Sequence, residues 1–254
     1  MTAALLPTYS LWTRDLKHFV RQRSRVIGAI GQPFVIWILL AAGFKNTASA
    51  AGTDYGAYLF PGVILLIALF AAIFSTISII DDRRSGFLQA VLASPASPAA
   101  IVTGKLLAGT TIALLQSLLF LVLLPFTGIG FTLEAFLLSM LVLAGTGMLL
   151  TALGFLLAWH MTSSQGFHAV MNLLLLPMWM LSGAFFPLEG AAGWMQILMR
   201  LNPMYYITTL FQNTFFLGSG VAAVPGPAPW ISVAILIGLF AVLYFVSLRT
   251  VRVS

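Results

Sequence analysis

Residues 58–80 read YLFPGVILLIALFAAIFSTISII, an unbroken run without a charged side chain. A helix needs about 20 mostly apolar residues to cross the hydrocarbon core of a bilayer, so this run predicts a transmembrane helix. Five further runs have the same character: 26–43, 106–126, 135–159, 167–186 and 230–248. The sequence therefore predicts an all-α, polytopic membrane protein with six transmembrane helices, in a single transmembrane domain over residues 1–254.

The composition agrees with a membrane environment. Hydrophobic residues make up 60% of the chain and charged residues only 7%, whereas soluble domains carry about 25% charged residues. Cysteine is absent, which excludes disulfides, thiolate metal sites and cysteine nucleophiles.

The basic residues predict how the chain is oriented. With six spans, only Lys45 and Arg200 fall on one side of the membrane. The other basic residues share the opposite side: Arg14, Lys17, Arg21, Arg23, Arg25, Arg83, Arg84, Lys105, Arg249 and Arg252. Because cytoplasmic loops collect Lys and Arg, we expect both termini in the cytoplasm and the protein in the cell (inner) membrane.

The segment before the first span, 8–25, has an amphipathic pattern. Trp12, Leu16 and Phe19 share one helical face, and the basic residues lie elsewhere. This pattern predicts a helix that lies in the membrane interface, with these three residues as its anchor. A cleaved signal peptide is the alternative, but the apolar run that follows is longer than the hydrophobic region of a signal peptide, which has 7–15 residues.

Residues 195–217 are apolar but interrupted by polar groups, among them Arg200, Asn202 and Gln212. An unpaired polar group is costly in lipid, so a lipid-exposed span is disfavoured. We expect two short re-entrant helices that dip in from the outer side and meet near Asn202 and Pro203.

A compact charged and apolar stretch, DDRRSGFLQAVLASP, occupies residues 81–95. A short helix fits after the charges, with Phe87, Leu88, Val91 and Leu92 on one face, and Pro95 stops it. The stretch could be a solvated loop whose charges only mark the membrane edge. A docking helix for a soluble partner explains the apolar face better.

These features together resemble the membrane subunit, or permease, of type-2 (ABC-2) ABC transporters. That family follows its second span with an acidic–basic–Gly pattern and a short helix ending in Ser/Thr-Pro, here DRRSG at 82–86 through Ser94 and Pro95. Two later family motifs are matched by LSGAFFP at 181–187 and LNPMYY at 201–206. Many members carry an Arg several residues after the Tyr, whereas this chain has Gln212 and Asn213.

The resemblance implies half of an ATP-driven exporter rather than an enzyme. Two permeases, identical or related, would pair in the bilayer and bind two ABC ATPase subunits. ATP and Mg would sit on the ATPase, and this chain would hold no cofactor and no metal and bind no nucleic acid. The cargo would be amphipathic, lipid-linked or drug-like.

The resemblance also implies roles for two groups of residues. It implies that the ATPase is contacted by Asp81, Asp82, Arg83, Arg84, Gly86, Phe87, Leu88, Val91, Leu92, Ser94 and Pro95. It also implies that an outer gate is formed by Gly183, Phe185, Phe186, Pro187, Asn202, Pro203, Tyr205 and Tyr206. ATP binding would push on the first group and thereby open the second.

Two other classes of protein remain as alternatives. An integral membrane enzyme or cofactor-assembly factor would need convergent polar groups inside the bilayer, and only isolated residues such as Gln116, Gln165 and Asn172 are present. A secondary transporter would need a buried titratable group or an inverted repeat. Lys105 and Glu134 lie at span ends, where we expect their side chains to reach the interface. An adjacent gene for an ATPase would favour the permease.

Overall fold

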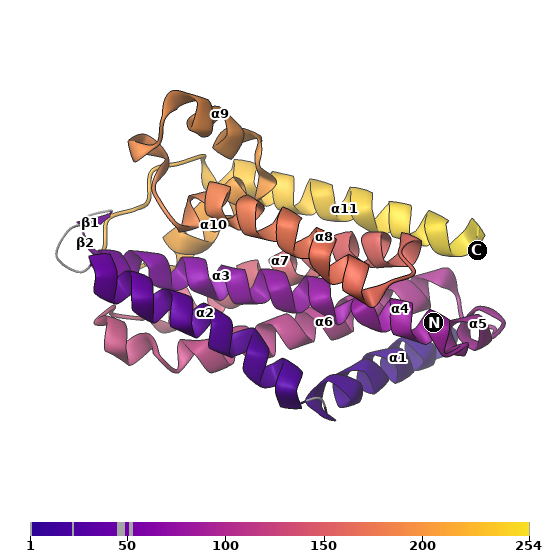
Figure 1. Ribbon diagram of the computed structural model, residues 1–254. Helices are drawn as coiled ribbons and strands as arrows, with labels where there is room; N and C mark the ends of the chain where they lie inside the picture. The colour runs from indigo at the N-terminus through magenta and orange to yellow at the C-terminus, as the bar shows by residue number, and fades with distance from the viewer. Residues whose placement is uncertain (1, 22, 45–48, 51–52, 254) are drawn as a thin grey trace.

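The computed structural model describes residues 2–21, 23–44, 49–50 and 53–253. Long helices run alongside one another in a bundle (Figure 1). The amino-terminal half contains α1 (Thr2–Arg21), α2 (Arg23–Phe44), β1 (Ser49–Ala50), β2 (Thr53–Asp54), α3 (Tyr55–Ser75), α4 (Ile77–Arg84), α5 (Phe87–Leu92), α6 (Pro98–Leu121) and η1 (Leu124–Thr127). The rest contains α7 (Leu133–His160), α8 (Ser164–Trp179), η2 (Met180–Ala184), η3 (Leu188–Gly190), α9 (Gly193–Leu201), α10 (Pro203–Phe215) and α11 (Pro229–Val253). β1 and β2 form a two-stranded antiparallel hairpin.

Five helical stretches in the described residues are long and apolar enough to cross a membrane. They are Tyr55–Arg84, Pro98–Leu121, Leu133–His160, Ser164–Ala184 and Pro229–Arg252, and each contains most of one predicted span. The remaining predicted span, 26–43, falls within α2, whose apolar part in the described residues is Pro33–Gly43. The chain is thus a helical, multi-pass protein, and the count of six spans stays a prediction.

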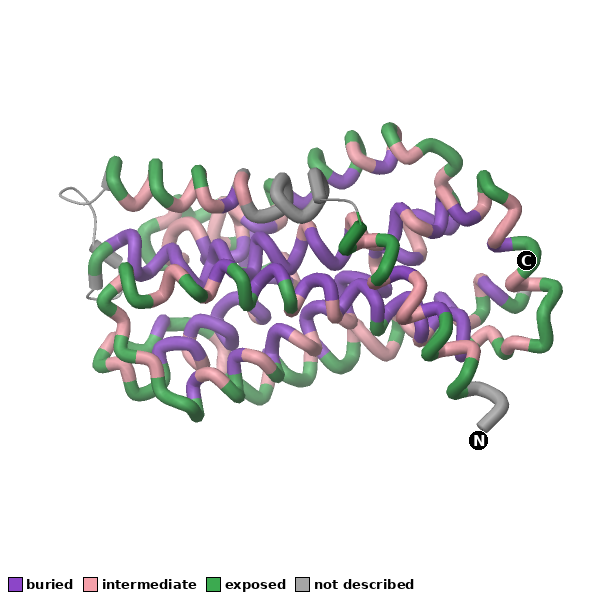
Figure 2. Tube along the Cα trace, turned by 90° about the horizontal axis from the view of Figure 1, so that it is seen from below, coloured by how far each residue is buried: buried purple, intermediate pink, exposed green. Residues whose placement is uncertain are grey.

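The core is built around α3. In the apolar part of Tyr55–Arg84, the stretch that begins with α3, 78% of the residues are buried, against 17% in the apolar part of α11. Helix α3 contacts α2, α6 and α7. Figure 2 shows buried residues gathered along the inner helices and exposed residues toward the outside. The indole nitrogen of Trp179 donates to the carbonyl of Gly62 at 2.7 Å, which ties the end of α8 to the middle of α3.

Glycines let the inner helices approach closely. A Cβ on Gly109 of α6 would lie 2.5 Å from Ser75 Oγ and from Thr151 of α7. A Cβ on Gly154 of α7 would lie 3.1 Å from the backbone of Ile73. Small residues are the usual means by which membrane helices pack closely, so α3, α6 and α7 form a tight three-helix centre.

The two ends of the bundle carry different features. Both chain ends and α5 lie at one end, whereas the β1–β2 hairpin and α9 lie toward the other (Figure 1). This arrangement places the docking helix expected from the sequence beside the two termini. Which end faces the cytoplasm remains a prediction from the basic residues.

Candidate functional site

Helix α5 begins after Gly86, which has a positive φ of 77° that glycine adopts without strain. Leu88 is only 5% exposed and belongs to the main hydrophobic core. Phe87, Val91 and Leu92 are partly buried against the same core. The apolar face expected from the sequence therefore lies against the chain's own bundle. The outward side of α5 and the turn that follows consists of Gln89, Ala90, Ala93, Ser94 and Pro95.

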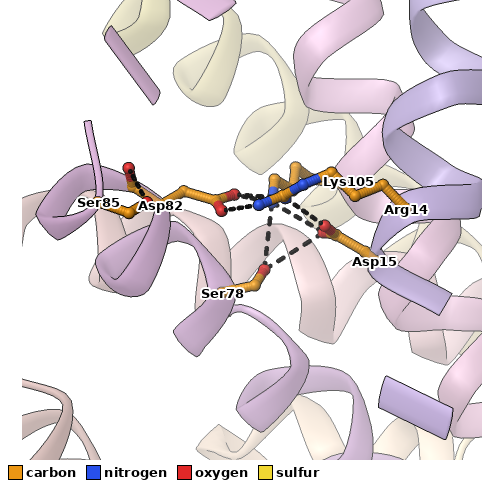
Figure 3. Close-up of polar contacts among 6 residues, drawn as sticks. All are labelled: Arg14, Asp15, Ser78, Asp82, Ser85 and Lys105. Atoms are coloured by element: carbon orange, nitrogen blue, oxygen red, sulfur yellow. Dashed lines mark hydrogen bonds and ion pairs between the residues drawn. The ribbon is translucent and has the colours of Figure 1, made fainter. Parts of the chain in front are cut away.

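A buried ion cluster is formed by Arg14, Asp15, Asp82 and Lys105 (Figure 3). The Lys105 ammonium is 2.8 Å from Asp15 Oδ2 and 2.6 Å from Asp82 Oδ2, and it also donates to Ser78 Oγ at 3.2 Å. Arg14 contacts Asp82 at 2.5 Å and Asp15 at 3.1 Å. These residues come from α1, α4 and α6, so the cluster joins three helices.

The cluster is balanced in charge and largely buried. It pairs two cations with two carboxylates, and the side chains of Asp15, Asp82 and Lys105 are 7%, 5% and 5% exposed. The pKa of Arg14 is raised: partial burial disfavours its charge, but the hydrogen bond and charge of Asp82, with Asp15, outweigh that effect. Buried charges persist only when they are paired, and here every member has an opposite partner.

The prediction that the Lys105 side chain reaches the interface is wrong. Helix α6 begins at Pro98, about two turns before Lys105, so the residue lies inside a packed helix rather than at its end. Asp15 was missed as a site residue. The sequence indicated it only through spacing. Asp15 lies four positions after Leu11 and so on the same face of α1, and Leu11 is buried.

Arg14 also connects the cluster to α5. Its guanidinium carbon lies 3.8 Å from the centroid of the Phe87 ring, within the range of a cation–π interaction. Since Phe87 is the first residue of α5, the docking helix contacts α1 directly.

The charges expected at the docking surface mostly bind inside the chain. Arg83 donates to the carbonyls of Trp159 and Met161, and Arg84 donates to the carbonyl of Thr162 at 2.8 Å. Asp81 Oδ1 accepts from Ser164 Oγ at 3.1 Å. The last carbonyls of a helix lack partners within it, and the two arginines satisfy carbonyls at and just past the end of α7. The α4 segment is thereby tied to the α7–α8 connection.

Trp12, Leu16 and Phe19, the predicted anchor of the amino-terminal helix, face the bundle. The Trp12 indole nitrogen donates to Thr111 Oγ1 of α6 at 3.1 Å, and Leu16 and Phe19 pack against the core. A Cβ on Gly104 of α6 would lie 3.0 Å from the Thr8 carbonyl, so α1 and α6 are in close contact. The position of α1 in the membrane interface stays a prediction.

The residues expected to form an outer gate meet at the other end of α3. Gly183, at a φ of 83° within η2, has its carbonyl bound by the Tyr58 hydroxyl at 2.7 Å, and the Tyr55 hydroxyl donates to the carbonyl of Phe185 at 2.8 Å. A Cβ on Gly183 would lie 3.5 Å from the ring of Tyr205. Phe186 and Pro187 follow and are half-buried.

Asn202 organises the second half of that region. Its side-chain oxygen caps α10 by accepting from the Met204 amide at 3.0 Å, and its amide nitrogen donates to the carbonyl of Met178 at 2.6 Å. Pro203 occupies the first position of α10, and the Tyr206 hydroxyl donates to the carbonyl of Arg200 at 3.0 Å. Two helices thus meet at Asn202, as the sequence predicts, while their re-entrant character is untested.

Long apolar helices and a charge-poor sequence place the chain among multi-pass membrane proteins. The chain belongs to the ABC-2 type transporter family, whose model matches residues 7–216. The family resemblance drawn from the motifs is confirmed. The matched region contains most of α1, the ion cluster, α5 and both helices that meet at Asn202.

Two of the relatives described here are named as permeases, and a third is named as a nodulation protein. The chain is 29% identical over 222 residues to "Putative transport permease ycf38" of Pyropia yezoensis, covering 84% of this chain and 74% of the relative. It is 27% identical over 173 residues to "Probable multidrug ABC transporter permease YbhR" of Escherichia coli (strain K12), covering 64% of this chain and 44% of the relative. "Nodulation protein J" of Rhizobium leguminosarum bv. viciae is 27% identical over 242 residues, covering 88% of this chain and 89% of the relative.

Proposed function

We propose that this chain is the permease subunit of an ATP-driven exporter that works with a separate ABC ATPase. The permease would pair in the bilayer with a second copy or a related chain. The ATPase would bind ATP and Mg, and this chain would supply the membrane path. Its cargo would be amphipathic, lipid-linked or drug-like. Family membership and the permease names of its relatives support the coarser part of this proposal.

The observation that carries the coupling proposal is the mounting of α5. Its inner side is fixed by Leu88 in the core and by Phe87 under Arg14. Its outer side presents the small residues Ala90 and Ala93, which would let a partner surface approach closely. A short helix fixed from behind and open in front is suited to receiving force from a soluble subunit.

Force on α5 would have two routes into the bundle. One passes through Arg14 and Asp82 to α1 and α6, by way of the ion cluster. The other passes through Arg83 and Arg84 to the α7–α8 connection. Closure of the ATPases on ATP would then move helices as rigid bodies, because the ligand favours one state of the assembly.

The outer region would respond to that movement as the gate. Gly183 lies beside the ring of Tyr205, which would be 3.5 Å from a Cβ added at this glycine, and the Tyr58 hydroxyl of α3 donates to the Gly183 carbonyl. A shift of α3 relative to α10 would therefore change the position of Gly183 relative to Tyr205. We assign the gate to these two residues and to the neighbouring Phe185, Phe186 and Asn202.

The test is copurification of the tagged permease with the ABC ATPase that is proposed as its partner. Ala90→Arg and Ala93→Arg put bulk and charge on the exposed side of α5 without touching the core. We expect each to reduce copurified ATPase at least tenfold, a loss of about 1.4 kcal/mol of binding energy, and to reduce permease-dependent ATP hydrolysis with it.

Ala192→Arg is the matched control, because Ala192 is an exposed alanine just before α9, toward the opposite end of the bundle. It should leave copurification unchanged. Wild-type binding and hydrolysis in both α5 variants would show that α5 is not the docking element.

A further inference from the structure

A cavity of about 350 Å³ lies beside the ion cluster, bounded by α1, α2, α3, α4, α6 and α8. Small-molecule sites in proteins span about 300–1,000 Å³ and combine apolar walls with a few polar groups. The volume is at the lower end of that range. The cavity lies within one chain and needs no partner to form its walls.

The cavity is elongated along α6. Its lining on that helix runs from Lys105 through Ala108 and Ile112 to Gln116, positions that share one helical face. Two residues that are 11 positions apart in a helix are about 16 Å apart along its axis. The opposite wall is apolar and includes Leu66, Phe70 and Phe74. A slot of this shape fits a single apolar chain better than a compact ring system.

One residue that lines the slot carries an unsatisfied polar atom. Gln116 is 1% exposed, and in the described part of the chain its Oε1 has no hydrogen-bond partner. Buried acceptors in folded proteins are almost always paired. The amide oxygen therefore points to a ligand that brings a hydrogen-bond donor, such as a hydroxyl or an amide N–H.

The charged end of the slot does not favour an ionic ligand. Lys105 directs its three donors to Asp15, Asp82 and Ser78. With Arg14 the cluster holds two cations and two carboxylates, so it adds no net charge to the cavity. A charged headgroup would have to displace one of these pairs, whereas an uncharged one would not.

The residues that line the cavity are exposed at two places, on α8 and at His18 of α1. His168, Asn172 and Leu176 line the cavity at four-residue spacing, and Asn172 and Leu176 are exposed. An amide on an exposed face of a helix that can span the membrane is expensive in lipid. Asn172 could instead contact the polar headgroup of a ligand that enters the cavity. The cavity thus has one amide at an exposed position, Asn172, and one at a buried position, Gln116.

We propose that this cavity binds an uncharged, single-chain amphiphile whose hydroxyl or amide group donates a hydrogen bond to Gln116. The apolar chain lies along Phe70 and Ile112. As the cargo site of an exporter the cavity rests on the proposed function, but the binding itself requires neither the ATPase nor nucleotide. The two ideas can therefore fail separately.

The experiment uses the full chain alone in phosphatidylcholine nanodiscs. The probe is a monoacylglycerol that carries a photoreactive diazirine in its chain, and the labelled residues are mapped by mass spectrometry. We expect labelling in α3 and α6 near Phe70 and Ile112, competed by unlabelled monoacylglycerol. Ala108→Phe, which fills the slot, should abolish it.

Gln116→Leu separates the hydrogen bond from the shape of the slot. It should weaken monoacylglycerol binding about fivefold, the effect of one hydrogen bond, and leave unchanged the binding of the fatty acid methyl ester of the same chain length, which lacks a donor. Gln165→Leu, at an exposed glutamine on α8, should change neither.

Labelling spread evenly over lipid-facing helices such as α11 and insensitive to Ala108→Phe and Gln116→Leu would mean a lipid annulus only, and would overturn the proposal. Equal weakening of both probes by Gln116→Leu would overturn the hydrogen-bond assignment. Loss of ATPase copurification has no bearing on either result.

Discussion

Among single residues, Lys105 is a buried cation that both carboxylates of the ion cluster contact. It joins Asp15 of α1 to Asp82 of α4 from within α6. Removing one partner from a buried ion pair leaves an uncompensated charge, which costs about 3–5 kcal/mol. The cluster therefore contributes to the stability of the fold as well as to the connection between α5 and the bundle.

Lys105→Met should lower the midpoint of thermal unfolding of the detergent-solubilised protein, by an amount that corresponds to about 3–5 kcal/mol. Met keeps much of the length of the side chain and removes the charge and the three hydrogen-bond donors of the ammonium. Lys17→Met is the control, since Lys17 is exposed on α1, and it should leave the midpoint within the error. Equal midpoints for the two variants would show that Lys105 is not held as a buried ion.

Gly109→Ala should also destabilise the protein, by about 1–3 kcal/mol, because the added methyl group overpacks the contact between α6 and its neighbours. It would lie 2.5 Å from atoms of Ser75 and Thr151. Gly238→Ala meets nothing within 4 Å and should be neutral or stabilising through helix propensity. The same thermal measurement compares them, and a Gly109→Ala protein as stable as Gly238→Ala would contradict the close packing.

The sequence identified some of these residues and missed others for a clear reason. Asp82 and Arg83 stand in a dense local run of charge, so they were found. Asp15 and Lys105 are 90 positions apart, and nothing in either local pattern indicates that they meet. Such long-range pairs depend on how helices pack, which a single sequence does not display.

At the scale of elements, α5 has two sides with opposite requirements. Leu88→Asp should reduce the fraction of protein that elutes as a single species in size-exclusion chromatography, because it buries a carboxylate in the core. Gln89→Asp, at the adjacent exposed position, should elute as the unmodified protein does. If Leu88→Asp instead elutes normally, the inner side of α5 is not packed as described.

The helices themselves were largely predictable, since apolar length alone marks them. The described structure extends several of them: the run that begins in α3 continues through α4 to Arg84, with a break at Thr76. The kink at Gly183, just after the end of helix α8, was not predictable. It depends on Gly183 at positive φ and on the tyrosines of α3 that bind the nearby carbonyls.

At the scale of the whole molecule, both chain ends and α5 lie at one end of the bundle (Figure 1). The chain has no cysteine, so single-cysteine variants can be labelled without a background. Arg252→Cys and Ala93→Cys should resist a membrane-impermeant maleimide added to intact cells, and Ala192→Cys should react. Labelling of position 252 from outside would overturn the predicted orientation and the count of six spans.

The central claim is that α5 is where a soluble ATPase meets this permease, and site-specific cross-linking tests it most directly. A thiol-reactive photo-cross-linker is placed on Ala93→Cys in membranes that also contain the ATPase, with Ala192→Cys as the matched position at the far end. We expect an adduct between permease and ATPase from position 93 and none from position 192. No adduct from position 93, or equal adducts from both, would contradict it.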